Sequence, residues 1–104
     1  MDYIEQIRDI IVSDINPEKI ILFGSRARGD YDTDSDYDFL VLKRGITNGR
    51  KLSGDLKIKF YQKRLLLPID VIVMDHDRFY QLSDTTGFIY KDIKKEGICI
   101  YGDI

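Results

Sequence analysis

Apolar residues change their spacing along the chain, and each spacing predicts one kind of element. Isoleucines recur at helical intervals within residues 3 to 14, which predicts an amphipathic helix. Asn16 and Pro17 should end that helix, because proline cannot continue it. Residues 20 to 23 form a short apolar run closed by Gly24, a pattern typical of a buried strand. The chain is therefore predicted to open with a helix followed by a strand.

The middle of the chain predicts two further strands separated by a basic helix. Residues 37 to 42 are mostly apolar, and residues 69 to 74 are rich in β-branched side chains, so both segments favour strands. Between them, residues 50 to 64 carry an apolar side chain at every fourth position from Leu52 to Phe60, with lysines on the other faces. That spacing predicts an amphipathic helix with a basic surface.

A final helix and a last strand complete the pattern. Asp75 or His76 could cap a helix that continues to Ile93 and that Gly87 weakens in its middle. Residues 98 to 101 predict a short strand. Strands that alternate with helices indicate an α/β or α+β fold, with a small mixed β-sheet flanked by helices.

The length and the distribution of charge narrow the class of protein. A chain of 104 residues is enough for one domain, residues 1–104. The net charge of -2 gives no overall attraction for polyanions, and we do not expect direct nucleic-acid binding. Residues 30 to 38 nevertheless hold five aspartates, and residues 43 to 64 hold eight basic residues against one acid. We interpret the basic helix as a solvated face, with an RNA- or partner-binding surface as the alternative.

The sequence also bears on location. A single cysteine, Cys99, cannot form an intrachain disulfide and fits a reducing compartment, and we expect it to pack in the core. No apolar run approaches the roughly 20 residues of a membrane helix, and the acidic, periodic N-terminus does not resemble a signal peptide. We therefore expect a cytoplasmic protein without a membrane segment.

A glycine–serine pair stands where the first predicted strand ends. Gly24 and Ser25 can bring backbone N–H groups close to an anion, and a helix starting there would add positive potential. Triphosphate oxygens are natural occupants of such a turn. Arg26 and Arg28 could contact phosphate as well, because guanidinium matches phosphate geometry, or could pair with the aspartates of residues 30 to 34. We interpret those loop aspartates mainly as solvating groups.

Three other carboxylates predict a metal site. Asp36 and Asp38 are two residues apart at the start of a predicted strand, so they point to one face about 6.6 Å apart. Two such carboxylates repel each other unless a cation lies between them, and Mg²⁺ prefers carboxylate and phosphate oxygens. Asp70 begins another strand, and if the two strands are neighbours the three acids converge. Such an arrangement suits two-metal phosphoryl chemistry.

These residues together resemble a known family. Residues 24 to 29 (GSRARG) and, five residues later, residues 35 to 41 (SDYDFLV) closely resemble the signature of the DNA polymerase β-like nucleotidyltransferases. The resemblance is greatest to the minimal nucleotidyltransferase branch. Asp70 matches the third acid that the family carries on a later strand. The order of the predicted elements agrees over nearly the whole chain.

The resemblance implies a role for each matching residue. Gly24 and Ser25 would hold the triphosphate of ATP, and Asp36 and Asp38 would bind both of two Mg²⁺ ions. Asp70 would bind the catalytic ion and help to deprotonate the acceptor hydroxyl. Attack on the α-phosphate would then release pyrophosphate.

The resemblance also implies a partner. Members of this branch are usually paired with a HEPN-domain ribonuclease toxin and act as its antitoxin, by adding AMP to a hydroxyl that is typically a tyrosine's. A chain of 104 residues leaves no room for a second acceptor-binding domain, so we expect a hetero-oligomer with that toxin. Two alternatives stay open: an antitoxin that only masks the toxin, and a nucleotidyltransferase for a small molecule of the aminoglycoside kind.

Overall fold

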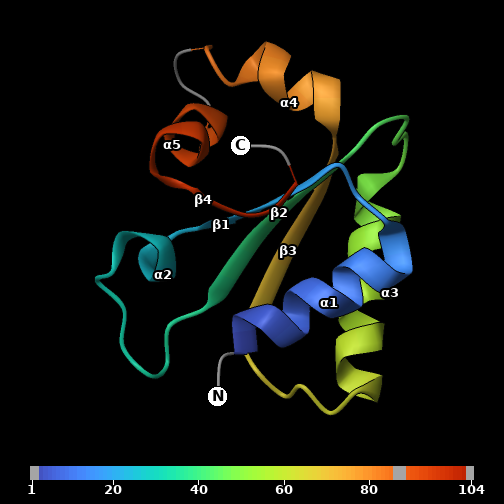
Figure 1. Ribbon diagram of the computed structural model, residues 1–104, viewed down its shortest axis with the longest axis vertical. Helices are drawn as coiled ribbons and strands as arrows, with labels where there is room; N and C mark the ends of the chain where they lie inside the picture. Colours follow the sequence, from blue (N-terminus) through green and yellow to red (C-terminus); the bar gives the residue numbers. More distant parts are fainter. Residues whose placement is uncertain (1–2, 86–88, 103–104) are drawn as a thin grey trace.

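The chain folds around one four-stranded sheet covered on both faces by helices (Figure 1). The structure is a computed structural model, and it describes residues 3–85 and 89–102. The strands are β1 (Lys19–Phe23), β2 (Tyr37–Lys43), β3 (Ile69–Asp75) and β4 (Ile98–Gly102). The helices are α1 (Tyr3–Ile15), α2 (Ser25–Arg28), α3 (Gly49–Gln62), α4 (His76–Leu82) and α5 (Ile89–Glu96). The predicted mixed α/β architecture is confirmed.

The order of the strands determines which strand ends meet. The sheet runs β3-β2-β1-β4, with β1 antiparallel to both neighbours and β2 parallel to β3. The carboxyl end of β1 therefore lies beside the amino ends of β2 and β3. Phe23 pairs with Asp38 across this end of the sheet, and Asp38 pairs with Asp70. All the predicted metal-binding and phosphate-binding residues belong to that one end.

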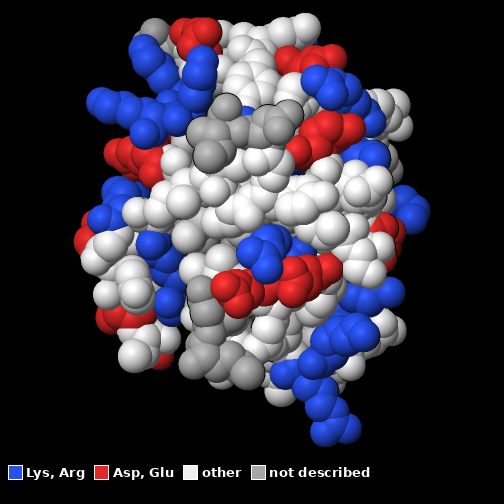
Figure 2. Space-filling view, in the orientation of Figure 1, with Lys and Arg blue, Asp and Glu red and all other residues white. Residues whose placement is uncertain are grey.

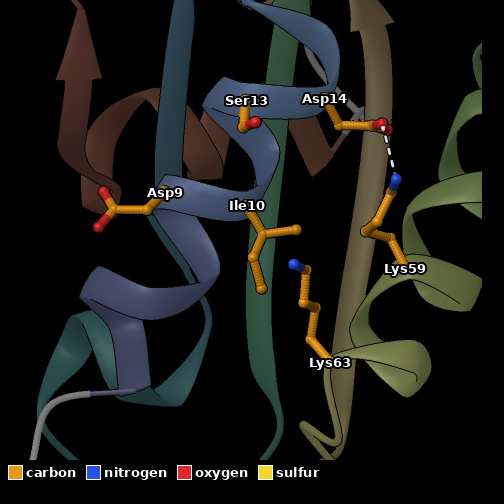
Figure 3. A pocket seen from close by; sticks show the side chains of 6 residues that line it. All are labelled: Asp9, Ile10, Ser13, Asp14, Lys59 and Lys63. Carbon is orange, nitrogen blue, oxygen red and sulfur yellow. Dashed lines mark ion pairs between the residues drawn. The ribbon is translucent and has the colours of Figure 1, made fainter.

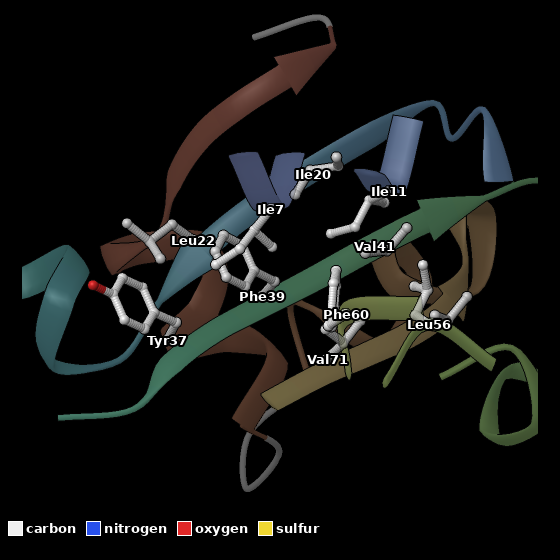
Figure 4. Packing of buried hydrophobic residues seen from close by; sticks show 11 residues of the cluster. Ile7, Ile11, Ile20, Leu22, Tyr37, Phe39, Val41, Leu56, Phe60 and Val71 are labelled. Atoms are coloured by element: carbon white, nitrogen blue, oxygen red, sulfur yellow. The ribbon is translucent and has the colours of Figure 1, made fainter. Parts of the chain in front are cut away.

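Side chains alternate between the two faces of the sheet along each strand, so the core is divided into two clusters, one on each face. One face packs against α1 and α3, and Figure 4 shows side chains of both helices meeting those of β1, β2 and β3. The other face packs against α4 and α5. On β2, Phe39 and Val41 belong to the first cluster, while Leu40 and Leu42 belong to the second. Asp38, two residues before Leu40, therefore faces the side of α4 and α5.

The helices of the first face form where the apolar spacing predicts them. Ile7 and Ile11 are fully buried on α1, and Leu56 and Phe60 are buried on α3. Asn48 caps α3 by accepting a hydrogen bond from the backbone N–H of Lys51 at 3.1 Å. None of the helices among the described residues combines the length and the apolar character that a membrane span requires.

The prediction of one continuous final helix is wrong, because the structure has two helices. α4 ends at Leu82 and α5 begins at Ile89. After Leu82, the Ser83 hydroxyl donates to the Tyr80 carbonyl oxygen at 3.1 Å, and such local bonding competes with helix continuation. Gly87, predicted to weaken the helix, lies outside the described residues.

Asp75 provides the predicted cap of α4 and also ties this helix to the turn after β2. Its carboxylate accepts hydrogen bonds from the backbone N–H of Arg78 at 3.0 Å and of Gly45 at 2.8 Å. These two donors, Arg78 first, hold the pKa of Asp75 below its ordinary value of 3.8. The ionised carboxylate therefore stabilises the folded state.

We expect Asp75→Ala to lower the melting temperature at neutral pH, because two backbone donors lose their acceptor. The folded pKa is depressed, so the carboxylate's contribution is present above the unfolded value of about 3.9 and is lost as pH falls through the folded pKa. Thermal melts of wild type and variant should therefore converge in acid. The control is Asp84→Ala, which removes only an exposed ion pair with Lys94. If the difference in melting temperature between Asp75→Ala and wild type stays constant as the pH falls through the folded pKa of Asp75, this account is wrong.

Candidate active site

A strained turn at Gly24 connects β1 to α2. Gly24 has φ 76° and ψ -160°, a left-handed φ that side chains other than glycine's rarely allow. Its carbonyl oxygen accepts from the backbone N–H groups of Ala27 and Arg28, each at 3.1 Å. A Cβ atom at this position would collide with the Oδ2 atom of Asp38. The turn thus requires glycine twice, for its backbone conformation and for its close approach to a carboxylate.

Strand pairing places two of the predicted metal ligands next to each other. Asp38 and Asp70 are paired in register on the parallel strands β2 and β3, and neighbouring strands lie about 4.8 Å apart. Each lies two residues before a side chain that packs on the α4 and α5 face, Leu40 for Asp38 and Ile72 for Asp70. Residues two apart on a strand point to the same face, so both carboxylates point to that face. Asp36 lies two residues before Asp38, just ahead of β2, and is exposed. The two strands are therefore neighbours, which is the condition for the three acids to converge.

The charges at this end of the sheet are unbalanced. Partial burial raises the pKa of Asp38, and the negative charges of Asp70 and then Asp36 raise it further. The guanidinium of Arg28 acts in the opposite direction but does not cancel them. A carboxylate in this environment is stabilised by an added cation.

The donor set fits Mg²⁺ by chemistry. Asp36, Asp38 and Asp70 supply hard oxygen donors at one end of the sheet, and Mg²⁺ is typically held by one or two carboxylates plus phosphate oxygens. Within the described residues, no group of three or more His, Cys, Asp or Glu forms a ready-made metal cluster. Asp70 instead lies with its Oδ1 atom 3.7 Å from Lys57 Nζ, in an exposed ion pair. Exposed pairs of this kind contribute little stability, so this one opposes a competing cation only weakly.

A cavity of about 350 Å³ opens beside the Gly24 turn. Phe23, Gly24 and Arg28 form one side of it, and α5 contributes Ile89, Asp92, Ile93 and Glu96. Its volume is near the lower end of the range of about 300–1,000 Å³ for small-molecule sites. The predicted residues Gly24 and Arg28 therefore line a space that a nucleotide could enter. Sequence reasoning missed Asp92 and Glu96, since the helical spacing of α5 gives no sign of which end of the sheet it covers.

Arg28 faces both the cavity and the acids around it. Its Nε atom lies 3.3 Å from Asp30 Oδ2, and its Nη1 atom lies 3.8 Å from Glu96 Oε2. These are exposed ion pairs, so the guanidinium can change partners at small cost. Arg28 thus forms the ion pair with a loop aspartate that the sequence offered as one alternative. It also lines the cavity beside Gly24, and its contact with phosphate stays a prediction.

Arg26 has a different environment, because its guanidinium is engaged by the loop that follows α2. Nε donates to the Ser35 carbonyl oxygen at 3.2 Å, and Nη2 donates to the Asp32 carbonyl oxygen at 3.3 Å. The guanidinium carbon lies 3.8 Å from the centre of the Tyr37 ring and 4.7 Å from that of Tyr31. Arg26 therefore holds the loop that ends in Asp36 through backbone carbonyl oxygens, not through the aspartate carboxylates that the sequence offered as one alternative. Its contact with nucleotide stays a prediction.

The loop aspartates have mainly local partners. Asp32 Oδ1 accepts from the backbone N–H of Asp34 at 2.8 Å, and the Asp32 N–H donates to Ser35 Oγ at 3.0 Å. Asp30 pairs with Arg28. The sequence indicates that the loop acids are solvating groups; these contacts show that Asp32 in addition holds the local conformation of the loop.

Two other features lie away from this end of the sheet. His76 follows β3 at the end opposite to Asp70, with its Nδ1 atom 2.8 Å from Asp77 Oδ1. A cavity of about 360 Å³ lies between α1 and α3, where Asp14 pairs with Lys59 at 3.7 Å (Figure 3). It faces the other side of the sheet from Asp38. Neither feature adds a residue to the acidic site.

We expect Gly24→Ala to destabilise the fold by more than about 1 kcal/mol, because the native φ is positive and the new Cβ meets Asp38. Urea denaturation measures the change. Gly54→Ala is the matched control: Gly54 lies within α3 with no atom near an added Cβ, so alanine should leave stability unchanged or raise it by up to about 1 kcal/mol. Equal effects of the two substitutions would show that the Gly24 turn is not strained.

The contacts of Arg26 lead to a second prediction. Arg26→Ala should cost about 1–2 kcal/mol through the loss of two hydrogen bonds and the ring contacts, and should speed amide exchange in residues 29 to 36. Arg26→Lys should recover only part of the loss, because an ammonium cannot reproduce the flat two-carbonyl contact. Arg28→Ala serves as control and should leave exchange in the Tyr31 to Ser35 segment unchanged. The same exchange pattern in both alanine variants would refute a special role for Arg26.

Comparison with known proteins agrees with this geometry. The family model described as a nucleotidyltransferase domain matches residues 4–100. A candidate protein adenylyltransferase of Methanocaldococcus jannaschii is 38% identical over 72 residues, which cover 69% of this chain and 68% of that protein. The family match includes the Gly24 turn and the strands that carry the acids.

Two solved structures share the fold. A toxin–antitoxin crystallised with AMP-PNP superposes with a TM-score of 0.60 at 21% identity, covering 95% of this chain and 73% of that chain. A mutant of the toxin–antitoxin MntA-HpeT gives a TM-score of 0.61 at 17% identity, covering 95% and 72%. These identities support the fold alone, while the family match extends over nearly the whole chain. The chain therefore belongs to the nucleotidyltransferase domain family and is a nucleotidyltransferase.

Proposed function

We propose that this nucleotidyltransferase is an antitoxin that transfers AMP from ATP to the hydroxyl group of a tyrosine in a HEPN-domain ribonuclease toxin. The observation that carries the proposal is the in-register pairing of Asp38 with Asp70 beside the Gly24 turn. The similarity to a candidate protein adenylyltransferase supports a protein as acceptor. The fold shared with a toxin–antitoxin crystallised with AMP-PNP supports the nucleotide and the kind of partner.

In this proposal Asp36 and Asp38 would hold two Mg²⁺ ions, and Asp70 would hold one of them. Bound there, Mg²⁺ would neutralise charge on the triphosphate and make the acceptor hydroxyl a better nucleophile. The chain's own contribution is to keep the carboxylates on one face of the sheet and at one end. The ion pair between Lys57 and Asp70 would give way to this arrangement.

The chemistry assigns one task to each group of the chain. The backbone at Gly24 and Ser25 and the side chain of Arg28 bind the triphosphate, and the cavity under α5 takes part of the nucleotide. The acceptor oxygen forms a bond to the α-phosphorus, and the bond from that phosphorus to the bridging oxygen of the β-phosphate breaks. Pyrophosphate leaves, and Asp70 accepts the proton of the acceptor hydroxyl.

Transfer of AMP would silence a ribonuclease by simple electrostatics. The modified hydroxyl gains bulk and a negative charge at a place where the RNA phosphate must bind. No change in the toxin's fold is required for this effect.

The test is transfer of label from α-³²P-ATP to a purified HEPN-domain toxin in the presence of Mg²⁺. Asp38→Asn and Asp36→Asn should each slow labelling by about 100-fold or more, because the loss of a metal ligand costs several kcal/mol in the transition state. Asp84→Asn, an exposed change between α4 and α5, should label at the wild-type rate. Labelling that persists in Asp38→Asn would refute the proposed metal site.

A masking antitoxin is the second candidate, and the exposed apolar residues Tyr61 and Leu66 near the end of α3 favour a binding surface. The two mechanisms differ in one measurement, the residual ribonuclease activity of the toxin mixed with Asp38→Asn. Full protection by a variant that transfers no label would assign neutralisation to masking.

A further inference from the structure

A shallow hollow of about 300 Å³ lies where α3 ends and the chain turns toward β3. We call it the α3 hollow, and it is lined chiefly by Lys57, Phe60, Tyr61, Leu65, Leu66 and Ile69. All of these except Lys57 present apolar or aromatic groups. The space is large enough for one or two side chains of another protein, at the lower limit of small-molecule sites.

The rim of the α3 hollow exposes large apolar side chains to solvent. Tyr61 is 72% exposed, Leu66 is 73% exposed, and Ile58 on the neighbouring turn of α3 is 58% exposed. Helical spacing places Ile58 and Tyr61 on one stripe of α3. Isolated apolar residues are common on surfaces, but a contiguous group around a hollow marks an interaction site.

The same rim is strongly basic. Lys57 lines the α3 hollow, and Arg64, which stands between the lining residues Tyr61 and Leu65, forms no ion pair with any described residue. Lys63 is not part of this rim, because it lines the cavity between α1 and α3. Figure 2 shows basic side chains gathered at the lower right of the molecule, over the end of α3. A partner that covers this surface must bring acidic groups to it.

The α3 hollow adjoins the acidic site through one residue. Lys57 lines the α3 hollow, and its Nζ atom also lies 3.7 Å from Asp70 Oδ1. Ile69, at the other side of the hollow, immediately precedes Asp70 on the edge strand β3. Phe60 and Ile69 belong to the α1 and α3 face, whereas the Asp70 carboxylate points to the other face. A protein bound in the hollow therefore lies at the sheet edge that carries Asp70 and meets that carboxylate around the edge, where Lys57 reaches it.

We propose that the α3 hollow and its basic rim dock the acceptor protein, through a segment that carries a leucine or aromatic side chain between acidic residues. This inference rests on the proposed function, and it names the surface and the chemistry by which that function chooses its acceptor. A second copy of this chain fits less well, because two basic rims would then face each other. A nucleic acid fits less well because, of the aromatic rings that line the hollow, Tyr61 is exposed and Phe60 is buried, whereas single-strand binding stacks successive bases on several rings.

The test uses two fluorescent synthetic peptides, each with one leucine and one tyrosine. Glutamates flank these two residues in the acidic peptide, and lysines flank them in the basic peptide. Binding is measured first, by fluorescence anisotropy without ATP. The acidic peptide should bind at least about tenfold more tightly, as several favourable charge contacts imply. Arg64→Glu should remove most of that preference, and Leu66→Ser should weaken the binding of both peptides.

Arg50→Glu is the matched control, because Arg50 lies at the other end of α3, roughly 20 Å away and beyond the Debye length of about 8 Å at physiological salt. It should leave peptide binding unchanged. Equal binding of the two peptides, equal effects of Arg50→Glu and Arg64→Glu, or displacement of the acidic peptide by an unstructured RNA would overturn the proposal. A dimer in sedimentation that Leu66→Ser abolishes would assign the surface to a second copy instead.

Labelling of the same peptides by α-³²P-ATP separates this inference from the proposed function. Selective binding without AMP transfer supports the docking surface and counts against the transferase role with a tyrosine acceptor. Transfer to both peptides at equal rates, unaffected by Arg64→Glu, supports the transferase and overturns the docking surface.

Discussion

The parallel pairing of β2 with β3 is the constraint on which the rest of the site depends. It sets Asp38 directly beside Asp70. Burial, and after it the negative charge of Asp70, raise the pKa of Asp38, so the two carboxylates oppose this arrangement. The pairing holds because residues further along the same strands are buried on both faces of the sheet. The burial of apolar side chains further along the strands thus offsets the electrostatic repulsion between the carboxylates at their amino ends.

Two separate cores make this pairing hard to shift. Phe39 and Val71 belong to the cluster under α1 and α3, while Leu40 belongs to the cluster under α4 and α5. A slip of one residue would exchange these faces, so that every apolar side chain of the strand would meet the wrong helices. The positions of the acids are therefore determined by side chains that have no part in the chemistry.

Much of this could be predicted from local patterns. The strands ending near Phe23 and starting near Tyr37 and Ile69 follow from short apolar runs, and the family signature assigns the acids. The engagement of Arg26 with Ser35 and Tyr37 could not be predicted, because an arginine's partners depend on how the loop closes. The ion pair of Lys57 with Asp70 was equally hidden, since it joins a helix to an edge strand across the side of the sheet.

The contact between Gly24 and Asp38 has a consequence for how such a chain can change over evolutionary time. A side chain at position 24 requires space that the carboxylate of position 38 occupies. A smaller residue at position 38 would relieve the clash but would also remove that carboxylate. A single substitution at either position is therefore harmful, and glycine and aspartate must be kept together. The segment between Gly29 and Asp34 is held by local contacts, such as that of Asp32 with Asp34, and not by a clash with the acids of the strands, and its closure cost rises only slowly with length. Sequence variation among descendants of this chain should therefore accumulate in that loop, while positions 24 and 38 stay unchanged.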